Sequence, residues 1–162
     1  AKLNAAASFT PVWGYSDEWT TNLEMPTLGR ERVARLYPLR AVAAAGAVVV
    51  GGSDWNYGAL DPLLSIETGV TRADPYGPSE LEQFTSEAVD LRLMIDAYTI
   101  NGAWLVHKDD ELGSIEVGKR ADIVVYDRNL FEIDPAGISD ANVELTIFDG
   151  RVVYDRAPVA EK

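Results

Sequence analysis

Residues 47–55 restrict the possible folds of the chain most strongly. In this segment an apolar run is followed by a glycine-rich turn that contains a carboxylate. Residues 47–50 read Ala-Val-Val-Val, which is too short for a helix and uniformly apolar, as expected of a strand buried on both faces. The turn that follows reads Gly-Gly-Ser-Asp-Trp and contains Asp54. Catalytic carboxylates of α/β enzymes lie at the carboxyl ends of such strands. The segment therefore predicts an α/β fold with Asp54 at the end of a buried strand.

The first half of the chain is predicted to alternate strands with helices. Its elements are assigned from apolar runs, helical spacing and cap residues. They are a strand over 5–12 that ends near Pro11, a long loop over 13–28, a helix over 30–45 interrupted near Pro38 and closed by Gly46, the strand 47–50, and a helix over 63–70 capped by Asp61 with Pro62 at its first position.

The second half begins with helices and then changes to short extended pieces. Apolar residues at 91, 94, 95 and 98 have helical spacing, and we expect Thr85 or Ser86 to cap this helix. A further helix is expected over 100–107. The pair Asp149-Gly150 separates two apolar runs and predicts a β-hairpin, because both central residues of a type I′ turn need positive φ.

Several short strings occur in an order that resembles the amidohydrolase superfamily, most closely its third family, which includes the formamide deformylase-like hydrolases. The strings are Leu-Gly-Arg-Glu-Arg at 28–32, Tyr-Pro-Leu-Arg at 37–40, Ala-Gly at 45–46, Gly-Ser-Asp at 52–54, Asp-Pro-Leu at 61–63, Thr-Arg at 71–72, Ala-Tyr-Thr-Ile-Asn-Gly-Ala at 97–103 and Gly-Ser-Ile-Glu at 113–116. The Ala121-Asp122 pair is also typical of this family. The resemblance covers most of the chain and concerns the C-terminal portion of such enzymes.

The resemblance implies an α/β fold that forms the last part of a TIM-type (β/α)8 barrel, together with strands of the small β-sandwich beside it. Residues 1–110 would form the last strand–helix units of the barrel, 111–156 the sandwich strands with their hairpin, and 157–162 a frayed tail. A whole barrel needs about 250 residues, so 162 residues cannot close one. The family's His-x-His pair is missing from the sequence, and we expect the chain to be part of a longer enzyme.

By the same resemblance, Asp54 is the catalytic residue and a metal ligand. In the family this aspartate takes the proton from the metal-bound water that attacks the substrate carbonyl. Zinc lowers the pKa of bound water to about 7, and a nearby carboxylate can accept the remaining proton. The alternative for Asp54 is a purely local role in the turn, where Asp is a common residue.

Aromatic residues near the ends of the two strands are candidates for substrate binding. Trp13 and Trp55 could line a pocket for an apolar amide, together with Tyr15 and Trp19. The alternative is packing in the core or against loops, because aromatic side chains are large and usually buried somewhere.

The function implied by the resemblance is hydrolysis of the C–N bond of an amide-type small molecule by water that a divalent metal, zinc in our expectation, activates. The alternative is an inactive fragment or binding module, because the chain retains one ligand of about five and a catalytic zinc needs three protein ligands. Its one histidine, His107, lies near a predicted helix end and matches no metal position of the family.

The charge and composition of the chain indicate which kinds of partner it can bind. Acidic residues outnumber basic ones 26 to 14, which argues against nucleic-acid binding. The sequence has no cysteine and no apolar run of about 18 residues, so we expect neither disulfides nor a membrane span, and place the chain in the cytoplasm. A piece cut from a barrel exposes strand edges. We therefore expect the remainder of the enzyme, or a second copy, to cover them.

Overall fold

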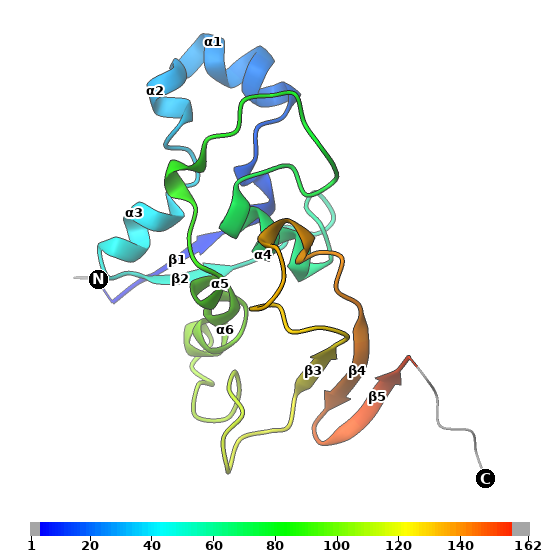
Figure 1. Ribbon diagram of the computed structural model, residues 1–162. Coiled ribbons are helices and arrows are strands. Elements are labelled where there is room, and N and C mark those ends of the chain that lie inside the picture. Colours follow the sequence, from blue (N-terminus) through cyan, green and yellow to red (C-terminus); the bar gives the residue numbers. More distant parts are fainter. Residues whose placement is uncertain (1–3, 157–162) are drawn as a thin grey trace.

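The computed structural model describes residues 4–156, so the tail predicted over 157–162 lies outside the described residues. Two small sheets and a set of short helices alternate along this part of the chain (Figure 1). The strands are β1 (Ala6–Phe9), β2 (Val48–Gly51), β3 (Ile123–Tyr126), β4 (Val143–Phe148) and β5 (Arg151–Asp155). The helices are α1 (Met25–Leu28), α2 (Arg30–Val33), α3 (Leu39–Ala44), α4 (Pro62–Thr71), α5 (Leu91–Tyr98) and α6 (Ile100–Leu105), with shorter helical turns η1 (Pro11–Gly14), η2 (Thr20–Glu24), η3 (Thr85–Glu87) and η4 (Pro135–Gly137).

The first sheet consists of the parallel strands β1 and β2, paired from Ala6 with Val48 to Phe9 with Gly51. The prediction of a buried strand is confirmed, because Val49 and Val50 are both buried. Helices α3, α5 and α6 all contact β2. Parallel strands joined through a helix place their carboxyl ends at one edge of the sheet. The segments after Phe9 and after Gly51 therefore start side by side.

Two helix caps show which local signals decide where helices begin. Asp61 caps α4 by accepting a hydrogen bond from the Leu63 amide at 2.9 Å, with Pro62 at the first helical position, as predicted. The predicted cap at Thr85 or Ser86 is wrong. Asp90 caps α5 by accepting from the Leu93 amide at 2.7 Å, and Thr85 instead begins the separate turn η3. Both Thr and Asp are good cap residues, and the extended backbone at Asp90 decided between them.

The region before β2 is more helical than expected. The strand predicted over 5–12 ends at Phe9, because Pro11 opens the turn η1. The predicted loop 13–28 contains η2 and α1, which follow each other directly. The helix predicted over 30–45 is two short helices, α2 and α3, with residues 34–38 between them. The break near Pro38 is thus confirmed, and Gly46 follows α3 with a φ of 78°.

One hydrophobic core joins segments from most of the described chain. It brings together Leu39 of α3, Val49 of β2, and Leu63 and Ile66 of α4, with Met94 and Ala97 of α5 and, from beyond residue 110, Leu130, Ile138 and Ala141. A buried carboxylate also links these parts, since Glu67 of α4 accepts a hydrogen bond from the Ser139 amide at 2.7 Å. The segment between β3 and β4 therefore anchors the second sheet to the helices that support β2.

The second sheet has the antiparallel order β3-β4-β5. Asp149 and Gly150 join β4 to β5 with φ values of 50° and 74°, which confirms the predicted hairpin turn. The Ala121-Asp122 pair holds this turn from outside, because the Asp122 carboxylate accepts from the Asp149 amide at 2.7 Å and the Ala121 carbonyl accepts from the Gly150 amide. The Ala121-Asp122 pair therefore has a structural role. None of the helices between residues 4 and 156 combines the length and the apolar character that a membrane-spanning helix needs.

Candidate functional site

Asp54 lies three residues after the end of β2, in a tight turn that leaves it exposed to solvent. Its backbone is left-handed, with a φ of 48°, which Asp tolerates better than most residues. The Asp54 carbonyl accepts hydrogen bonds from the amides of Tyr57 and Gly58, each at 2.8 Å, and the Ser53 hydroxyl accepts from the Trp55 amide. The backbone of the turn is therefore fixed by its own hydrogen bonds, and the Asp54 side chain is free to meet a ligand or a further ligating group.

The end of β2 is held in place by two side chains from the helical hairpin α5–α6. The Asn101 side-chain amide donates to the Val49 carbonyl at 3.0 Å, and the Tyr98 hydroxyl donates to the Gly52 carbonyl at 3.3 Å. The Tyr98 ring lies so close to Gly51 that a Cβ there would collide with it. Burial also raises the pKa of the Tyr98 phenol, which therefore stays protonated as a donor. The Tyr-Thr-Ile-Asn string therefore has a structural role, because Tyr98 and Asn101 position the strand that leads to Asp54.

The described residues do not by themselves make a metal site. Among residues 4–156, no group of three or more His, Cys, Asp or Glu side chains could hold a metal ion. The one histidine, His107, is exposed just after α6, in a left-handed conformation with its amide bonded to the Trp104 carbonyl. Asp54 alone cannot supply the three protein ligands of a catalytic zinc. A metal held at Asp54 would need ligands from outside this part of the chain.

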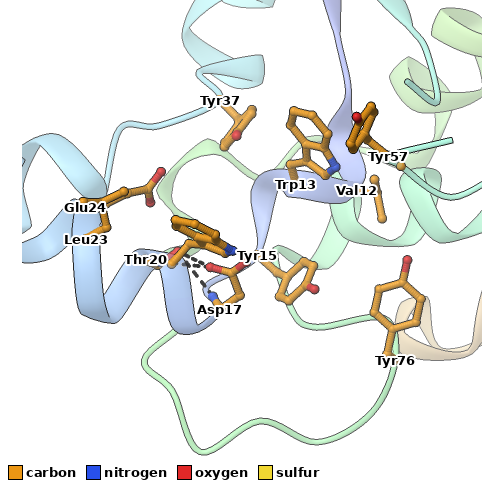
Figure 2. Close-up of a pocket in the computed structure, with 12 residues that line it drawn as sticks. Val12, Trp13, Tyr15, Asp17, Thr20, Leu23, Glu24, Tyr37, Tyr57 and Tyr76 are labelled. Atoms are coloured by element: carbon orange, nitrogen blue, oxygen red, sulfur yellow. Dashed lines mark hydrogen bonds between the residues drawn. The ribbon is translucent and has the colours of Figure 1, made fainter. Parts of the chain in front are cut away.

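An aromatic hollow of about 480 Å³ lies beside this edge of the sheet (Figure 2). It is formed by residues of η1 and η2, by the segment between them, and by the loops that follow α2, β2 and α4. The residues that line it are Val12, Trp13, Tyr15, Asp17, Trp19, Thr20, Leu23, Glu24, Tyr37, Tyr57, Gly58 and Tyr76. We call this pocket the aromatic hollow.

The structure separates the two tryptophans proposed for substrate binding. Trp13 lines the aromatic hollow, together with Tyr15 and Trp19. Trp55 does not line it, and its side chain is 65% exposed on the turn beside Asp54. Asp54 itself is not a lining residue either. It is joined to the hollow through its turn, since the Tyr57 and Gly58 amides that bind its carbonyl belong to two lining residues.

Sequence reasoning missed three tyrosines of the aromatic hollow, namely Tyr37, Tyr57 and Tyr76. Tyr57 carried a usable signal, because it follows Asp54 by three residues in the same turn. Tyr37 and Tyr76 are far from Trp13 in sequence, and only the folded loops bring them together. The rings of Tyr15 and Tyr76 pack edge to face, with centroids 6.3 Å apart and planes at 70°. Such contacts fix the orientation of two walls of the hollow.

A buried arginine stabilises the wall that carries Tyr37. Arg72 follows α4 and donates to the carbonyls of Leu36 at 3.0 Å, Tyr37 at 3.4 Å and Phe84 at 3.4 Å. Burial lowers the pKa of Arg72, and the nearby Glu87 carboxylate opposes that shift. Arg72 belongs to the Thr-Arg string, so this string too has a structural role. The side chain binds three loop carbonyls rather than pointing a free charge into the hollow.

The aromatic hollow has two carboxylates, Asp17 and Glu24, and no cationic side chain among its lining residues. Burial raises the pKa of Tyr15, and the Asp74 and Asp17 carboxylates raise it further. Burial likewise raises the pKa of Tyr37, with added contributions from Glu24 and Asp17 and an opposing one from Arg72. Burial is the main cause of both shifts, and the nearby carboxylates add to it because a negative charge disfavours the phenolate. Tyr15 and Tyr37 are therefore neutral at pH 7.

The parallel pair β1–β2 and the groups beside its carboxyl end place the chain among α/β proteins. Proteins of this class bind ligands outside the carboxyl ends of their parallel strands. Residues 1–154 match the amidohydrolase family. The chain belongs to this family. It is 31% identical over 161 residues to YtcJ of Bacillus subtilis (strain 168), covering 97% of this chain and 29% of that protein. It is also 33% identical over 123 residues to the N-substituted formamide deformylase of Arthrobacter pascens, covering 75% of this chain and 22% of the relative.

Solved structures show the same fold. A metal-dependent hydrolase from Pyrococcus horikoshii OT3 superposes with a TM-score of 0.65 and 22% identity, over 83% of this chain and 26% of that one. An adenosine deaminase from Xanthomonas campestris, solved with bound zinc, superposes with a TM-score of 0.58 and 19% identity, over 97% of this chain and 34% of that one. The chain therefore spans about a third or less of the length of these relatives and neighbours.

Proposed function

We propose that residues 1–162 form part of a metal-dependent amidohydrolase that hydrolyses the C–N bond of an amide-type small molecule. The observation that carries this proposal is Asp54, an exposed carboxylate at the carboxyl end of a buried parallel strand, in a chain of the amidohydrolase family. The relative named as an N-substituted formamide deformylase supports the reaction class. In this proposal Asp54 is the catalytic carboxylate and one ligand of the metal.

The chain's own contribution to the reaction is a positioned acceptor for a proton. The Asp54 carboxylate is held on a turn whose backbone is bonded at both Tyr57 and Gly58, behind a strand fixed by Asn101. It would accept a proton from the attacking water, as general bases do when they lie within hydrogen-bond reach. The metal, which we propose to be zinc, activates that water when bound. Its other ligands would come from outside residues 4–156, which do not fit a metal site alone.

The finer placement in the fold is part of the same proposal. We place residues 1–110 in the last strand–helix units of a (β/α)8 barrel and residues 111–156 in the small β-sandwich beside it. The parallel pair β1–β2 and its covering helices support the first assignment, and the antiparallel sheet β3-β4-β5 supports the second. The aromatic hollow would then lie at the carboxyl-terminal face, where barrel enzymes bind their substrates.

A non-enzyme remains the second candidate, because the described residues contain no cluster of metal ligands while they do contain a pocket lined by aromatic side chains. A binding module of this kind would hold a small molecule in the aromatic hollow without turning it over. The two candidates predict different sequences for the part of the protein that precedes these residues. A His-x-His pair upstream of these residues, in the same reading frame, would favour the hydrolase.

The 162-residue chain on its own is expected to show no hydrolysis of N-formyl or N-acyl amides and only weak binding of Zn²⁺. One carboxylate cannot replace the imidazole ligands that a catalytic zinc needs. Isothermal titration with Zn²⁺ and an assay of amine release test this expectation. Submicromolar zinc binding that Asp54→Asn abolishes, or turnover by the isolated chain, would contradict it and show that these residues build a complete site.

The second sheet supports the expectation that the chain associates with another polypeptide or with a second copy of itself. Val124, Val125, Phe148, Val152 and Val153 are each more than two-fifths exposed. Successive strand residues point to opposite faces, so both faces of this sheet expose apolar side chains. Within residues 4–156, moreover, β1 and β2 pair only with each other. Exposed apolar patches and open strand edges favour association, and we propose that the rest of the enzyme or a second copy covers them.

Light scattering over a range of protein concentrations measures this association. We expect the wild-type chain to be larger than a monomer, and Val153→Glu on the sheet to reduce the apparent mass. Val117→Glu is the matched control, because Val117 is fully exposed outside the strands and its change should leave the mass unaltered. A dilute wild-type monomer that unfolds cooperatively would show that the sheet needs no cover.

A further inference from the structure

The aromatic hollow combines many π-faces with carboxylates and, among its lining residues, no cationic side chain. Six of the twelve lining residues are Trp or Tyr, and two are Asp17 and Glu24. Three of these six side chains are largely accessible to solvent, since Trp19 is 71%, Tyr57 86% and Tyr76 64% exposed. Exposed apolar side chains gathered around one concavity mark binding sites rather than ordinary surface. The composition of the hollow therefore indicates what kind of ligand it suits.

The two carboxylates of the hollow differ in their partners. Asp17 accepts hydrogen bonds from the Thr20 amide at 2.9 Å and the Thr20 hydroxyl at 3.1 Å, which fixes it at the start of η2 (Figure 2). Within residues 4–156, the Glu24 carboxylate makes no hydrogen bond or ion pair, and it projects toward the same space as Tyr37 and Trp13 (Figure 2). Its charge is therefore available to a ligand.

The residues that line the hollow include no cation that would neutralise this charge. Arg72, the cation that acts on Tyr37, is buried behind the wall and donates to three loop carbonyls. Arg30, on α2, is paired with Glu82. After the larger effect of burial, the carboxylates of Asp17 and Glu24 contribute to the raised pKa values of Tyr15 and Tyr37. The aromatic faces add to this effect, because the π-face of each ring is itself electronegative.

We propose that the aromatic hollow binds an organic cation, an ammonium group that carries an apolar substituent. Trp13, Trp19 and the tyrosines would contact the cationic group through their faces, and Glu24 would balance its charge. Aromatic cages recognise quaternary and alkylated ammonium groups in this way. If the chain serves the proposed amidohydrolase, the inference names the substrate class, an amide that bears a positive charge. Tyr57 connects the hollow to Asp54, because its amide donates to the Asp54 carbonyl.

Choline and 3,3-dimethylbutan-1-ol provide the test, because they have the same shape and differ in charge. Each is titrated into the 162-residue chain at low ionic strength while tryptophan fluorescence is followed, since Trp13 and Trp19 both line the hollow. We expect choline to bind saturably, with an affinity at least about fivefold higher than that of the alcohol. Equal affinities, or no saturation by choline, would overturn the proposal and leave the hollow as a neutral aromatic pocket.

Two variants locate the binding. Glu24→Gln and Trp19→Leu should each weaken choline binding about threefold or more, with little effect on the alcohol for Glu24→Gln. Glu18→Gln is the matched control, because Glu18 is exposed on the same segment and does not line the hollow. Equal losses in Glu18→Gln and Glu24→Gln would show a general charge effect and overturn the proposal. Circular dichroism checks that Trp19→Leu is folded, and Glu24→Gln keeps the test valid if it is not.

The experiment separates this inference from the proposed hydrolase. Choline binding requires no turnover and no metal, so it can succeed in a chain that proves to have no part in catalysis. An active enzyme that contains this segment but prefers the neutral alcohol would instead keep the proposed function and refute the cation site.

Discussion

Replacing Asp54 by Asn in the whole enzyme that contains this segment is expected to lower kcat about a thousandfold or more, because the change removes both a proton acceptor and a metal ligand. Asn has nearly the same shape as Asp and also tolerates the left-handed backbone observed at this position, where φ is 48°. The fold should therefore survive the substitution. Steady-state kinetics with an N-substituted formamide, together with the metal content of the purified variant, measures the effect.

The matched control is Asp110→Asn, which removes one exposed carboxylate from the loop after α6. It lines no part of the aromatic hollow, and its kcat should remain that of the wild type. If Asp54→Asn turned over substrate at an unchanged rate, Asp54 would have no part in the mechanism. The turn after β2 would then have only a local structural role, which is the alternative that the sequence left open.

Replacing Met94 by Ala is expected to lower the free energy of unfolding by about 2–5 kcal/mol. Met94 is fully buried in α5, and its sulfur packs so closely on α4 that a Cβ on Gly69 would lie 2.5 Å from it. Because the glycine leaves this space for the methionine, truncation to Ala would create a cavity between the two helices. Urea unfolding, followed by far-UV circular dichroism at one protein concentration, gives the change in stability.

Ile115→Ala serves as the control for the loss of an apolar side chain. Ile115 is 83% exposed, so its truncation creates no cavity and should change stability by less than about 0.5 kcal/mol. Comparable losses for Met94→Ala and Ile115→Ala would mean that the helix pair α4–α5 is not the centre of the core.

Sequence patterns predicted those elements whose signals are local. Asp61 followed by Pro62 predicted the start of α4, since a cap needs only the amides of its own first turn. Asp149-Gly150 predicted the hairpin, because the turn type depends on the φ of two residues. The apolar run at 47–50 predicted β2 and its burial, and hence the position of Asp54 at a strand end.

Where two signals competed, the sequence was insufficient. Thr85, Ser86 and Asp90 can all cap a helix, and the extended conformation that caps α5 occurs at Asp90. Similarly, residues 13–28 carry glycine, proline and polar residues that are typical of a loop, yet η2 and α1 form there. Tertiary packing overrides weak local propensity in such short segments, because one helical turn contributes little stability of its own.

The sequence by itself determined the family, the strand that precedes Asp54 and the local caps and turns, since each depends on residues close together in the chain. Only the tertiary structure decided the candidate binding site. It brought Tyr37, Tyr57 and Tyr76 around Trp13 and left Trp55 outside. These residues come from separate loops held by long-range bonds such as those from Arg72 to the Tyr37 and Phe84 carbonyls. Contacts between distant segments depend on the packed core, and no spacing pattern along the chain records them.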